Sequence, residues 1–267
     1  MPTPRVRLRA AAVSDVGVHR TVNQDAAFTA AWGSAVADGV GGGPAGDLAS
    51  AALVHRLAAG RVDTVDAESL AVSVRTANWD LRAHVQRDAS LTGMATTFTG
   101  VFVSAVGTVL LAHTGDSRAY LLRDGMLVQQ TRDDSYVQAL VDRGLVAAED
   151  AASHPRRNLI TASLSGGERD RVVVVEHDAR PGDRWVLCSD GLSDYVPHAE
   201  IAAAVTHSSA TQAASVAVSE ALEAGTRDNV TVVVCDVDLD TEGVSPERET
   251  SFYGAAAVRF TESLESA

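Results

Sequence analysis

Lysine is absent from the 267-residue sequence, so every side-chain cation other than histidine is an arginine. A P-loop nucleoside triphosphatase needs a lysine in its phosphate-binding loop, and that class of protein is therefore excluded. The charge balance is also one-sided, because 35 acidic residues outnumber 22 basic ones and give a formal net charge of −13. This excess argues against nucleic acid or an anionic membrane as a partner, and it favours divalent cations or basic protein surfaces.

Cysteines and long apolar segments are equally scarce. Cys188 and Cys235 are the two cysteines, and each lies in an apolar, strand-like run. This setting predicts buried free thiols in a reducing compartment rather than a disulfide framework. No apolar run approaches the length of a membrane-spanning helix, and the first ten residues lack the apolar core of a secretory signal. We therefore expect a cytoplasmic protein that has no membrane partner.

What the sequence does contain is the composition of a single globular domain, with 46% hydrophobic and 21% charged residues. Short β-rich runs separated by Gly107 and by Asp124-Gly125 predict hairpins, and hairpins imply antiparallel pairing. Strands are predicted at Val6–Val13, Ala26–Ala30, Ser34–Ala37, Thr96–Ser104, Thr108–His113, Arg118–Arg123, Leu127–Gln130, Val172–Val175, Trp185–Cys188 and Val230–Val234. Helices are predicted at Ala45–Ala59, Glu68–Arg87, Asp133–Gly144 and Ala210–Ala224.

The segment Val36–Ser50, VADGVGGGPAGDLAS, allows two interpretations. Gly41, Gly43 and Gly46 have the G-x-G-x-x-G spacing that holds a dinucleotide pyrophosphate, and they lie between a predicted strand and a predicted helix. Asp38 stands at the mouth of the same loop, where its negative charge would repel a pyrophosphate. Either the loop binds a nucleotide, or it presents Asp38 for another purpose.

Several aspartates lie where an apolar strand ends or begins: Asp38, Asp116, Asp190 and Asp228. Any one of them has an ordinary explanation, because aspartate is favoured in turns and at helix N-termini. Repeated at four strand ends, the pattern predicts carboxylates that meet at one edge of a sheet. Carboxylates, carbonyls and water are the ligands that Mg²⁺ and Mn²⁺ prefer, so the pattern predicts a divalent metal site.

At this point the sequence resembles the metal-dependent serine/threonine protein phosphatases of type 2C, in their bacterial form, from about Ala12 to Val237. The matching segments, in the family's motif order, are SDVGVHRTVNQDA, VADGVGGGPAGDLAS, GMATTFTGVFVS, HTGDSRAYLLRDG, TRDDSYVQALVDRG, HPRRNLIT, LCSDGLSDYV and GTRDNVTVVV. One such segment would be a weak signal, whereas all of them in order are specific. The resemblance implies an α+β fold, a four-layer α/β/β/α sandwich of two central antiparallel sheets with helices packed outside.

The resemblance also implies roles for individual residues at a core site for two Mn²⁺ or Mg²⁺ ions. Asp38 would bridge the two ions, and Gly39 would offer its backbone carbonyl to one of them. Asp190 and Asp228 would complete the protein ligands of the second ion. Asp25 would act through metal-bound water.

Beyond this core, Asp116 with Asp190 and Asp194 would supply a third, weaker metal site. Arg20 would hold the substrate phosphate, because a planar guanidinium matches two phosphate oxygens. The implied reaction is hydrolysis of phosphoserine and phosphothreonine by a metal-bridging water, without a covalent phosphoenzyme. The implied partners are phosphorylated protein substrates and a cognate Ser/Thr kinase, and we expect a monomer.

The sequence departs from the family pattern at three positions. Val40 replaces a histidine that eukaryotic members often carry as a candidate general acid, and bacterial members commonly lack it too. Asp134 replaces the histidine of the usual Asp-His-Ser, and Ala162 replaces an arginine found in many bacterial relatives. The last two changes concern substrate preference more than chemistry.

For domain organisation we predict a catalytic domain over 1–240, with a lid insertion at about 131–167, and a flexible C-terminal tail over 241–267. The sequence leaves two other functions open. The first is a catalytically weak, phosphoprotein-binding regulatory domain. The second is a dinucleotide-binding protein, which the glycine spacing favours and the predicted antiparallel strands oppose.

Overall fold

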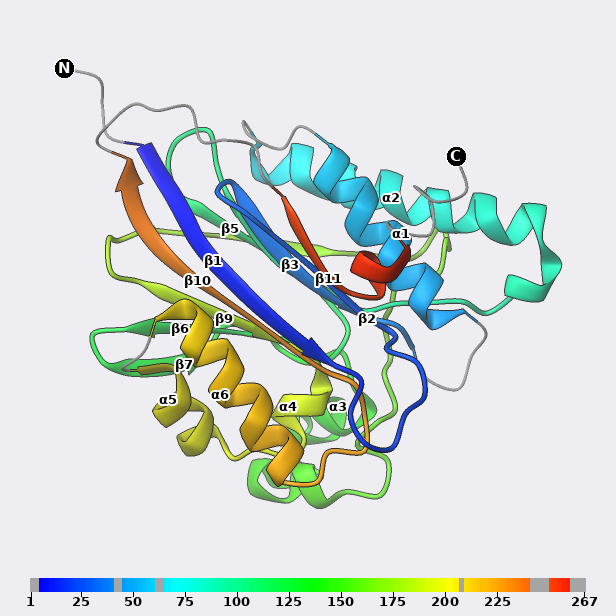
Figure 1. The fold of residues 1–267 in the computed structure, drawn as a ribbon. Coiled ribbons are helices and arrows are strands. Elements are labelled where there is room, and N and C mark those ends of the chain that lie inside the picture. The colour runs from blue at the N-terminus through cyan, green and yellow to red at the C-terminus, as the bar shows by residue number, and fades with distance from the viewer. Residues whose placement is uncertain (1–4, 41–44, 61–64, 207–208, 241–249, 260–267) are drawn as a thin grey trace.

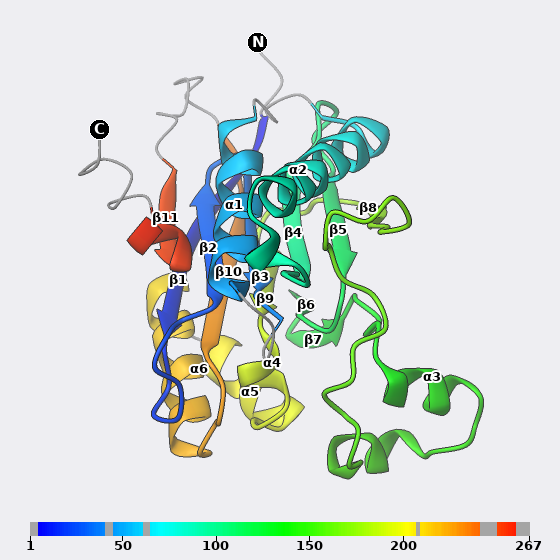
Figure 2. The same ribbon diagram turned by 90° about the vertical axis from the view of Figure 1, so that its right-hand side faces the viewer.

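Two antiparallel β-sheets stacked face to face form the centre of the computed structural model, and helices cover both outer faces (Figures 1 and 2). The structure describes residues 5–40, 45–60, 65–206, 209–240 and 250–259. The predicted four-layer α/β/β/α sandwich is confirmed. All strand pairs in the two described sheets are antiparallel, which is unlike the parallel sheet of a dinucleotide-binding fold.

The first sheet has five strands in the order β1-β10-β9-β6-β7. Its strands are β1 (Arg5–Asp15), β10 (Val230–Asp240), β9 (Arg184–Cys188), β6 (Arg118–Arg123) and β7 (Met126–Gln129). β10 is longer than predicted and pairs with β1 along its whole length. Beyond Val234 its residues alternate between apolar and acidic, so that Val237 is buried while Asp236 forms an ion pair with Arg184 at 2.6 Å.

Three helices pack on the outer face of the five-stranded sheet: α4 (Asp190–Ser193), α5 (His198–Thr206) and α6 (Ala210–Glu223). α6 begins with a capping box in which Ser209 and Gln212 bond each other's backbone N–H groups. α5 was not predicted. Its nine residues bury only Ile201 and Val205, so one i, i+4 pair is all the periodic signal it carries.

The second sheet has six strands in the order β11-β2-β3-β4-β5-β8. Its strands are β11 (Ser251–Gly254), β2 (Asp25–Ala30), β3 (Gly33–Asp38), β4 (Phe98–Val103), β5 (Val109–Thr114) and β8 (Val173–His177). Two helices cover its outer face, α1 (Gly46–Ala59) and α2 (Ala67–Arg87). α1 is apolar on several sides, as suits a helix packed against both the sheet and α2.

A third apolar cluster fills the space between the sheets and holds them together. It includes Trp185 of β9 and Val36 of β3, both fully buried. Cys235 also lies in it, and Cys188 lies under the helices of the first sheet; both are buried free thiols, as predicted. The inter-sheet packing sets how far apart the ends of the two sheets stand, and those ends carry the predicted site.

Between β7 and β8 the chain leaves the sandwich and projects from it as an extended loop (Figure 2). This stretch holds α3 (Tyr136–Asp142) and the 3₁₀ helix η2 (Ala148–Ser153); another 3₁₀ helix, η1 (Ala89–Leu91), follows α2. The loop between β7 and β8 coincides with the segment 131–167 predicted as a lid, and its role as a lid stays a prediction.

The predicted flexible tail over 241–267 is wrong for part of its length. Ser251–Gly254 form β11, which pairs with β2 at the edge of the six-stranded sheet. Ala255 and Ala256 follow in a short helical turn and are buried in the core under α1. These residues follow a stretch rich in polar residues, and that composition led to the prediction of a flexible tail where the structure has a strand. Residues 241–249 and 260–267 lie outside the described part of the chain.

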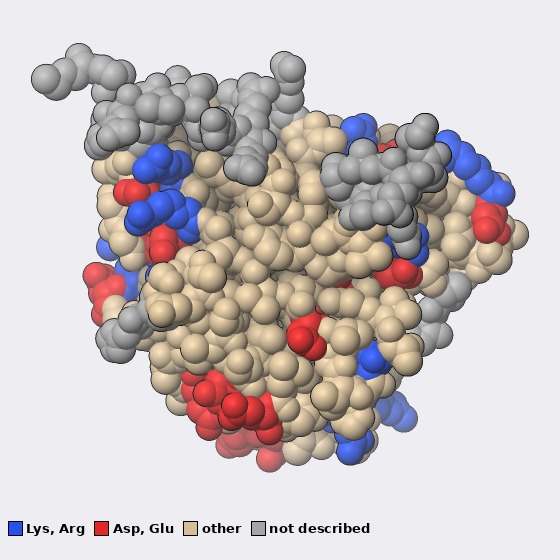
Figure 3. Space-filling view, in the orientation of Figure 1, with Lys and Arg blue, Asp and Glu red and all other residues tan. Residues whose placement is uncertain are grey.

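Charge is unevenly spread over the face seen in Figure 3. Acidic side chains gather at its lower edge, and a broad uncharged area separates them from basic side chains higher on the same face. Among the described residues, no helix is both long and apolar enough to cross a membrane.

Candidate metal and phosphate site

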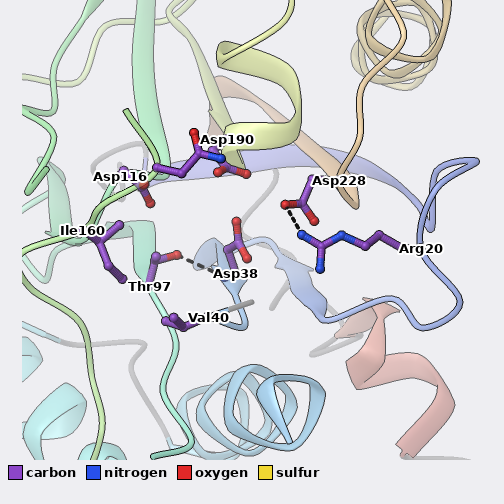
Figure 4. A pocket seen from close by; sticks show the side chains of 9 residues that line it. Arg20, Asp38, Val40, Thr97, Asp116, Ile160, Asp190 and Asp228 are labelled. Carbon is purple, nitrogen blue, oxygen red and sulfur yellow. Dashed lines mark hydrogen bonds and ion pairs between the residues drawn. The ribbon is translucent and has the colours of Figure 1, made fainter. Parts of the chain in front are cut away.

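A pocket of about 140 Å³ opens at one end of the sandwich, where strands of both sheets end or begin (Figure 4). Its walls are formed by Arg20, Asp38, Val40, Thr97, Asp116, Asn158, Ile160, Asp190 and Asp228. The predicted strand-end aspartates therefore do meet. They come from the end of β3, the turn between β5 and β6, the start of α4 and the loop before β10.

Asp25 and Asp38 are cross-strand partners on β2 and β3. Asp25 is buried, and its Oδ2 accepts a 2.7 Å hydrogen bond from Ser189 Oγ, whereas its Oδ1 has no partner among the described residues. Burial raises the pKa of Asp25 to about 6, with a smaller contribution from Asp228. Burial and the neighbouring carboxylates, Asp25 first among them, raise the pKa of Asp38 well above its ordinary value.

A second group of acids lies against the first. Burial and then the charges of Asp116 and Asp194 raise the pKa of Asp190 well above its ordinary value, and its Oδ1 is buried without a partner in the described structure. Burial, followed by the charge of Asp133, raises the pKa of Asp116 to about 7. Asp194 forms an ion pair with Arg157 of the projecting loop at 3.3 Å, and burial raises its pKa.

This accumulation of buried and half-buried carboxylates fits divalent cations. Carboxylates forced together without a cation are protonated or repel one another, and the raised pKa values of these aspartates express that cost. Among the described residues, no three His, Cys, Asp or Glu side chains converge into a ready metal cage. Mg²⁺ and Mn²⁺ do not require one, because such ions keep several waters and take few ligands directly from the protein. The donors present are therefore of the right kind.

Gly39 allows the close backbone approach that the site needs. Its N–H donates to the carbonyl of Gln24 at 3.1 Å, and a Cβ at this position would lie 2.3 Å from the carbonyl oxygen of Gly46. Only glycine fits there. The metal-binding role of the Gly39 carbonyl stays a prediction, and Gly41 and Gly43 lie outside the described residues.

Arg20 reaches into the pocket beside Asp228 (Figure 4). Its Nη2 donates to Asp228 Oδ2 at 2.6 Å, and its Nε donates to the backbone carbonyl of Arg227 at 3.3 Å. About a third of the Arg20 side chain stays exposed. A guanidinium held on one side by a carboxylate keeps further N–H donors for a second anion.

Some residues near the pocket were not assigned roles from the sequence. Thr97 Oγ1 accepts a 3.1 Å hydrogen bond from the N–H of Asp38 and pairs with Ser117 Oγ at 2.6 Å, so it holds the end of β3. Asn158 and Ile160 enter the wall from the projecting loop. Thr97 lies in the segment GMATTFTG, but no sequence signal separates a threonine that fixes a site from one that packs in a strand.

The unusual Asp133-Asp134 pair connects the projecting loop to the site. Arg118 donates to both carboxylate oxygens of Asp133, at 2.6 to 3.0 Å. Asp134 Oδ2 accepts from the N–H of Gly115 at 3.1 Å, and its carbonyl accepts from the N–H of Thr161 at 2.6 Å. The aspartate that replaces the usual histidine therefore joins both ends of the loop to the turn between β5 and β6. Val40, another of the three departures from the family pattern, forms an apolar part of the pocket wall.

Comparisons with known proteins point to the family that the sequence motifs resemble. The family model for protein phosphatase 2C matches residues 18–224. The serine/threonine protein phosphatase PstP of Mycobacterium tuberculosis is 43% identical over 243 residues, which are 90% of this chain and 47% of that protein. The serine/threonine phosphatase stp of Listeria monocytogenes is 32% identical over 216 residues, 78% of this chain and 85% of that protein. The chain thus spans about half the length of its mycobacterial relative.

Solved structures show the same fold. The crystal structure of M. tuberculosis PstP/Ppp has a TM-score of 0.81 at 42% identity and covers 86% of this chain and 98% of its own. The PstP catalytic domain in complex with two manganese ions has a TM-score of 0.80 at 40% identity, covering 87% of this chain and 99% of its own. Sequence and fold agree, and the chain belongs to the protein phosphatase 2C family.

Proposed function

We propose that this chain is a Mn²⁺- or Mg²⁺-dependent phosphatase that removes phosphate from phosphoserine and phosphothreonine in proteins. The observation that carries the proposal is a pocket in which half-buried aspartates from both sheets surround a space reached by Arg20. The family membership, and relatives that are named serine/threonine phosphatases, support it.

Asp38, the Gly39 carbonyl, Asp190 and Asp228 would hold two divalent ions, as the complex of the related PstP domain with two manganese ions suggests. Asp25 would act through water. Such ions, when bound, neutralise phosphoryl oxygens and lower the pKa of a water that attacks phosphorus. A third ion would be held by Asp116 with Asp190 and Asp194.

The chain's own side chains would bind and orient the phosphate. Arg20 would donate to two phosphate oxygens from the edge of its guanidinium that does not face Asp228. The carboxylate of Asp228 would keep the guanidinium from swinging out of the pocket. Val40 and Ile160 would make the wall apolar and limit the water that reaches the phosphorus.

No nucleophilic side chain is assigned to the reaction. Burial raises the pKa of the Cys188 thiol to about 12, so the group stays neutral and is a poor nucleophile. Ser189 Oγ donates to Asp25 and accepts from the N–H of Thr231 at 3.0 Å, which makes it a support for Asp25. These contacts favour direct attack by water over a covalent phosphoenzyme.

The decisive experiment is hydrolysis of an aryl phosphate and of a phosphothreonine peptide with Mn²⁺, with Mg²⁺ or with chelator. Asp38→Asn and Asp190→Asn are expected to lose at least about a hundredfold in kcat/KM, because each removes a charge from the metal ligands. The matched control is Asp88→Asn, an exposed N-terminal cap of η1 that keeps its side-chain hydrogen-bond acceptor. Turnover in chelator, or unchanged activity in both pocket variants, would overturn the proposal.

The same experiment separates the phosphatase from a phosphoprotein-binding regulatory domain, which would bind the peptide in the presence of Mn²⁺ and release no phosphate. A cognate Ser/Thr kinase, a monomeric state and a cytoplasmic location belong to the proposal as well. Co-purification and sedimentation of the full chain test the first two.

A further inference from the structure

The segment Ser251–Arg259 lies outside the residues matched by the family model, yet it is packed into the molecule. β11 adds a strand to the edge of the six-stranded sheet beside β2, and the helical turn that follows lies against α1 (Figures 1 and 2). We call Ser251–Arg259 the C-terminal clip. Its Ala256 is fully buried, so the clip is part of the core rather than a loosely attached end.

The end of β11 lies against the backbone of a site residue. Gly254 pairs with Ala26 and has a φ of +60°, and a Cβ at this position would lie 2.2 Å from the carbonyl oxygen of Asp25. Glycine is required twice over, by its backbone conformation and by this contact. Asp25 begins β2 and faces Asp38 across the strand pair, so the clip is in contact with the peptide that carries one of the buried site carboxylates.

The other end of the clip holds the beginning of α1. Arg259 Nη2 donates to Asp47 Oδ2 at 2.5 Å, in the first turn of that helix. Further along α1, His55 Nε2 is hydrogen-bonded to the carbonyl of Ala256 at 2.8 Å, and its ring lies 4.4 Å from that of Phe252.

The first two turns of α1 touch the backbone on both sides of the site. Ser50 Oγ donates to the carbonyl of Gln24 at 2.6 Å, next to Asp25. The Gly46 carbonyl packs so closely on Gly39 that no side chain fits between them. A displacement of α1 would therefore move Gly39 and the start of β2 together.

We propose that the C-terminal clip positions residues of the metal site. This proposal rests on the proposed metal-dependent function. Gly254 sets the position of Asp25 by direct contact, and Arg259 sets the position of Gly39 through Asp47 and the start of α1. Outer contacts of this kind orient the groups that bind a metal, and their loss lowers metal affinity about ten- to a hundredfold.

The test compares matched variants of the full chain by calorimetric titration with Mn²⁺ alone. Gly254→Ala introduces a methyl group against Asp25, and Gly125→Ala is its control, because Gly125 also has a positive φ, +78°, but no neighbour within 4 Å of a Cβ. We expect Gly254→Ala to bind Mn²⁺ about tenfold more weakly than Gly125→Ala. With a phosphopeptide, its kcat should approach that of the wild type once Mn²⁺ is saturating.

Arg259→Gln provides a second test that does not depend on the folding of the glycine variant. Its control is Arg56→Gln, which removes the 2.9 Å ion pair of Arg56 with Asp80 from the other end of α1. We expect a loss of Mn²⁺ affinity in Arg259→Gln only. A clip with a merely structural role would lower the melting temperature and leave Mn²⁺ affinity equal to that of the controls, which would overturn the proposal.

The outcome remains separable from that of the proposed function. If the wild type binds Mn²⁺ but releases no phosphate from peptides, the phosphatase proposal fails, whereas the comparison of Mn²⁺ affinities still decides the role of the clip.

Discussion

Arg20, the residue expected to bind the substrate phosphate, is hydrogen-bonded to a proposed metal ligand of the same site. Its 2.6 Å bond to Asp228 ties the proposed phosphate-binding group to a proposed metal ligand. Such a pairing holds the guanidinium in place before substrate arrives, which lowers the entropy lost on binding. It also means that a change at Arg20 removes a partner of Asp228, so kinetics must separate the two effects.

We predict that Arg20→Ala raises KM for a phosphopeptide by about tenfold or more, because a charge-assisted hydrogen bond contributes roughly 1.5–3 kcal/mol. Arg20→Lys should recover only part of this, since an ammonium lacks the planar fork. Steady-state kinetics at saturating Mn²⁺ measure KM and kcat for the wild type and both variants. An unchanged KM with a lowered kcat would instead place Arg20 in the support of Asp228 alone.

At the scale of elements, the projecting loop is fastened to the sandwich by charged side chains. Arg118, the first residue of β6, donates to both carboxylate oxygens of Asp133 at the start of the loop. Asp133 is 7% exposed and lies near Asp116, so the arginine neutralises one acid in a crowded group. The Arg157–Asp194 pair holds the loop from its other side.

We predict that Arg118→Met destabilises the protein by about 3 kcal/mol, because it leaves the Asp133 charge buried and unpaired. Arg118→Met with Asp133→Leu should recover part of that loss, since neither charge then remains. Urea unfolding of the two variants measures both values. As a control, Arg82→Met breaks an exposed pair with Glu168 and should cost under about 1 kcal/mol. Equal losses of unfolding free energy for Arg118→Met and Arg82→Met would contradict the interpretation of Arg118–Asp133 as a buried ion pair.

For the whole molecule, the concentration of buried acids makes stability depend on pH and on metal. The pKa values of Asp25, about 6, and Asp116, about 7, lie above the values near 4 expected in an unfolded chain. Between about pH 4 and pH 7 the folded state therefore binds more protons, and the contribution of these groups to stability falls as pH rises. Metal binding requires the ionised carboxylates and has the opposite dependence.

We accordingly predict that Mn²⁺ raises the melting temperature more at pH 7.5 than at pH 5.5. At a hundredfold excess over Kd the stabilisation amounts to about 2.7 kcal/mol. Differential scanning fluorimetry with Mn²⁺ and with chelator at each pH measures the shift. Subtracting the melting temperature in chelator from that in Mn²⁺ removes the pH dependence that comes from groups remote from the site. A larger shift at pH 5.5 would contradict the assignment of these acids.

The strand segments other than β11, the antiparallel pairing and the strand-end aspartates could be predicted from the sequence. Each depends on residues close together in the chain: Asp38 follows its own strand, and Gly107 turns its own hairpin. The sandwich of two central sheets was implied by the family resemblance instead, because strands such as β2 and β5 are buried along their whole length and carry no apolar and polar alternation. What such local patterns cannot supply is the identity of a distant partner.

Only the tertiary structure decided the contacts that join remote segments. Gly254 meets Asp25, Arg20 meets Asp228, and Arg118 meets Asp133, although nothing near any of these residues in the sequence names its partner. The raised pKa values likewise arise from burial and from neighbours on other strands. The sequence by itself determined which chemical groups the site contains, because those belong to single residues. Their distances, charges and supports were decided by packing, which depends on the whole chain at once.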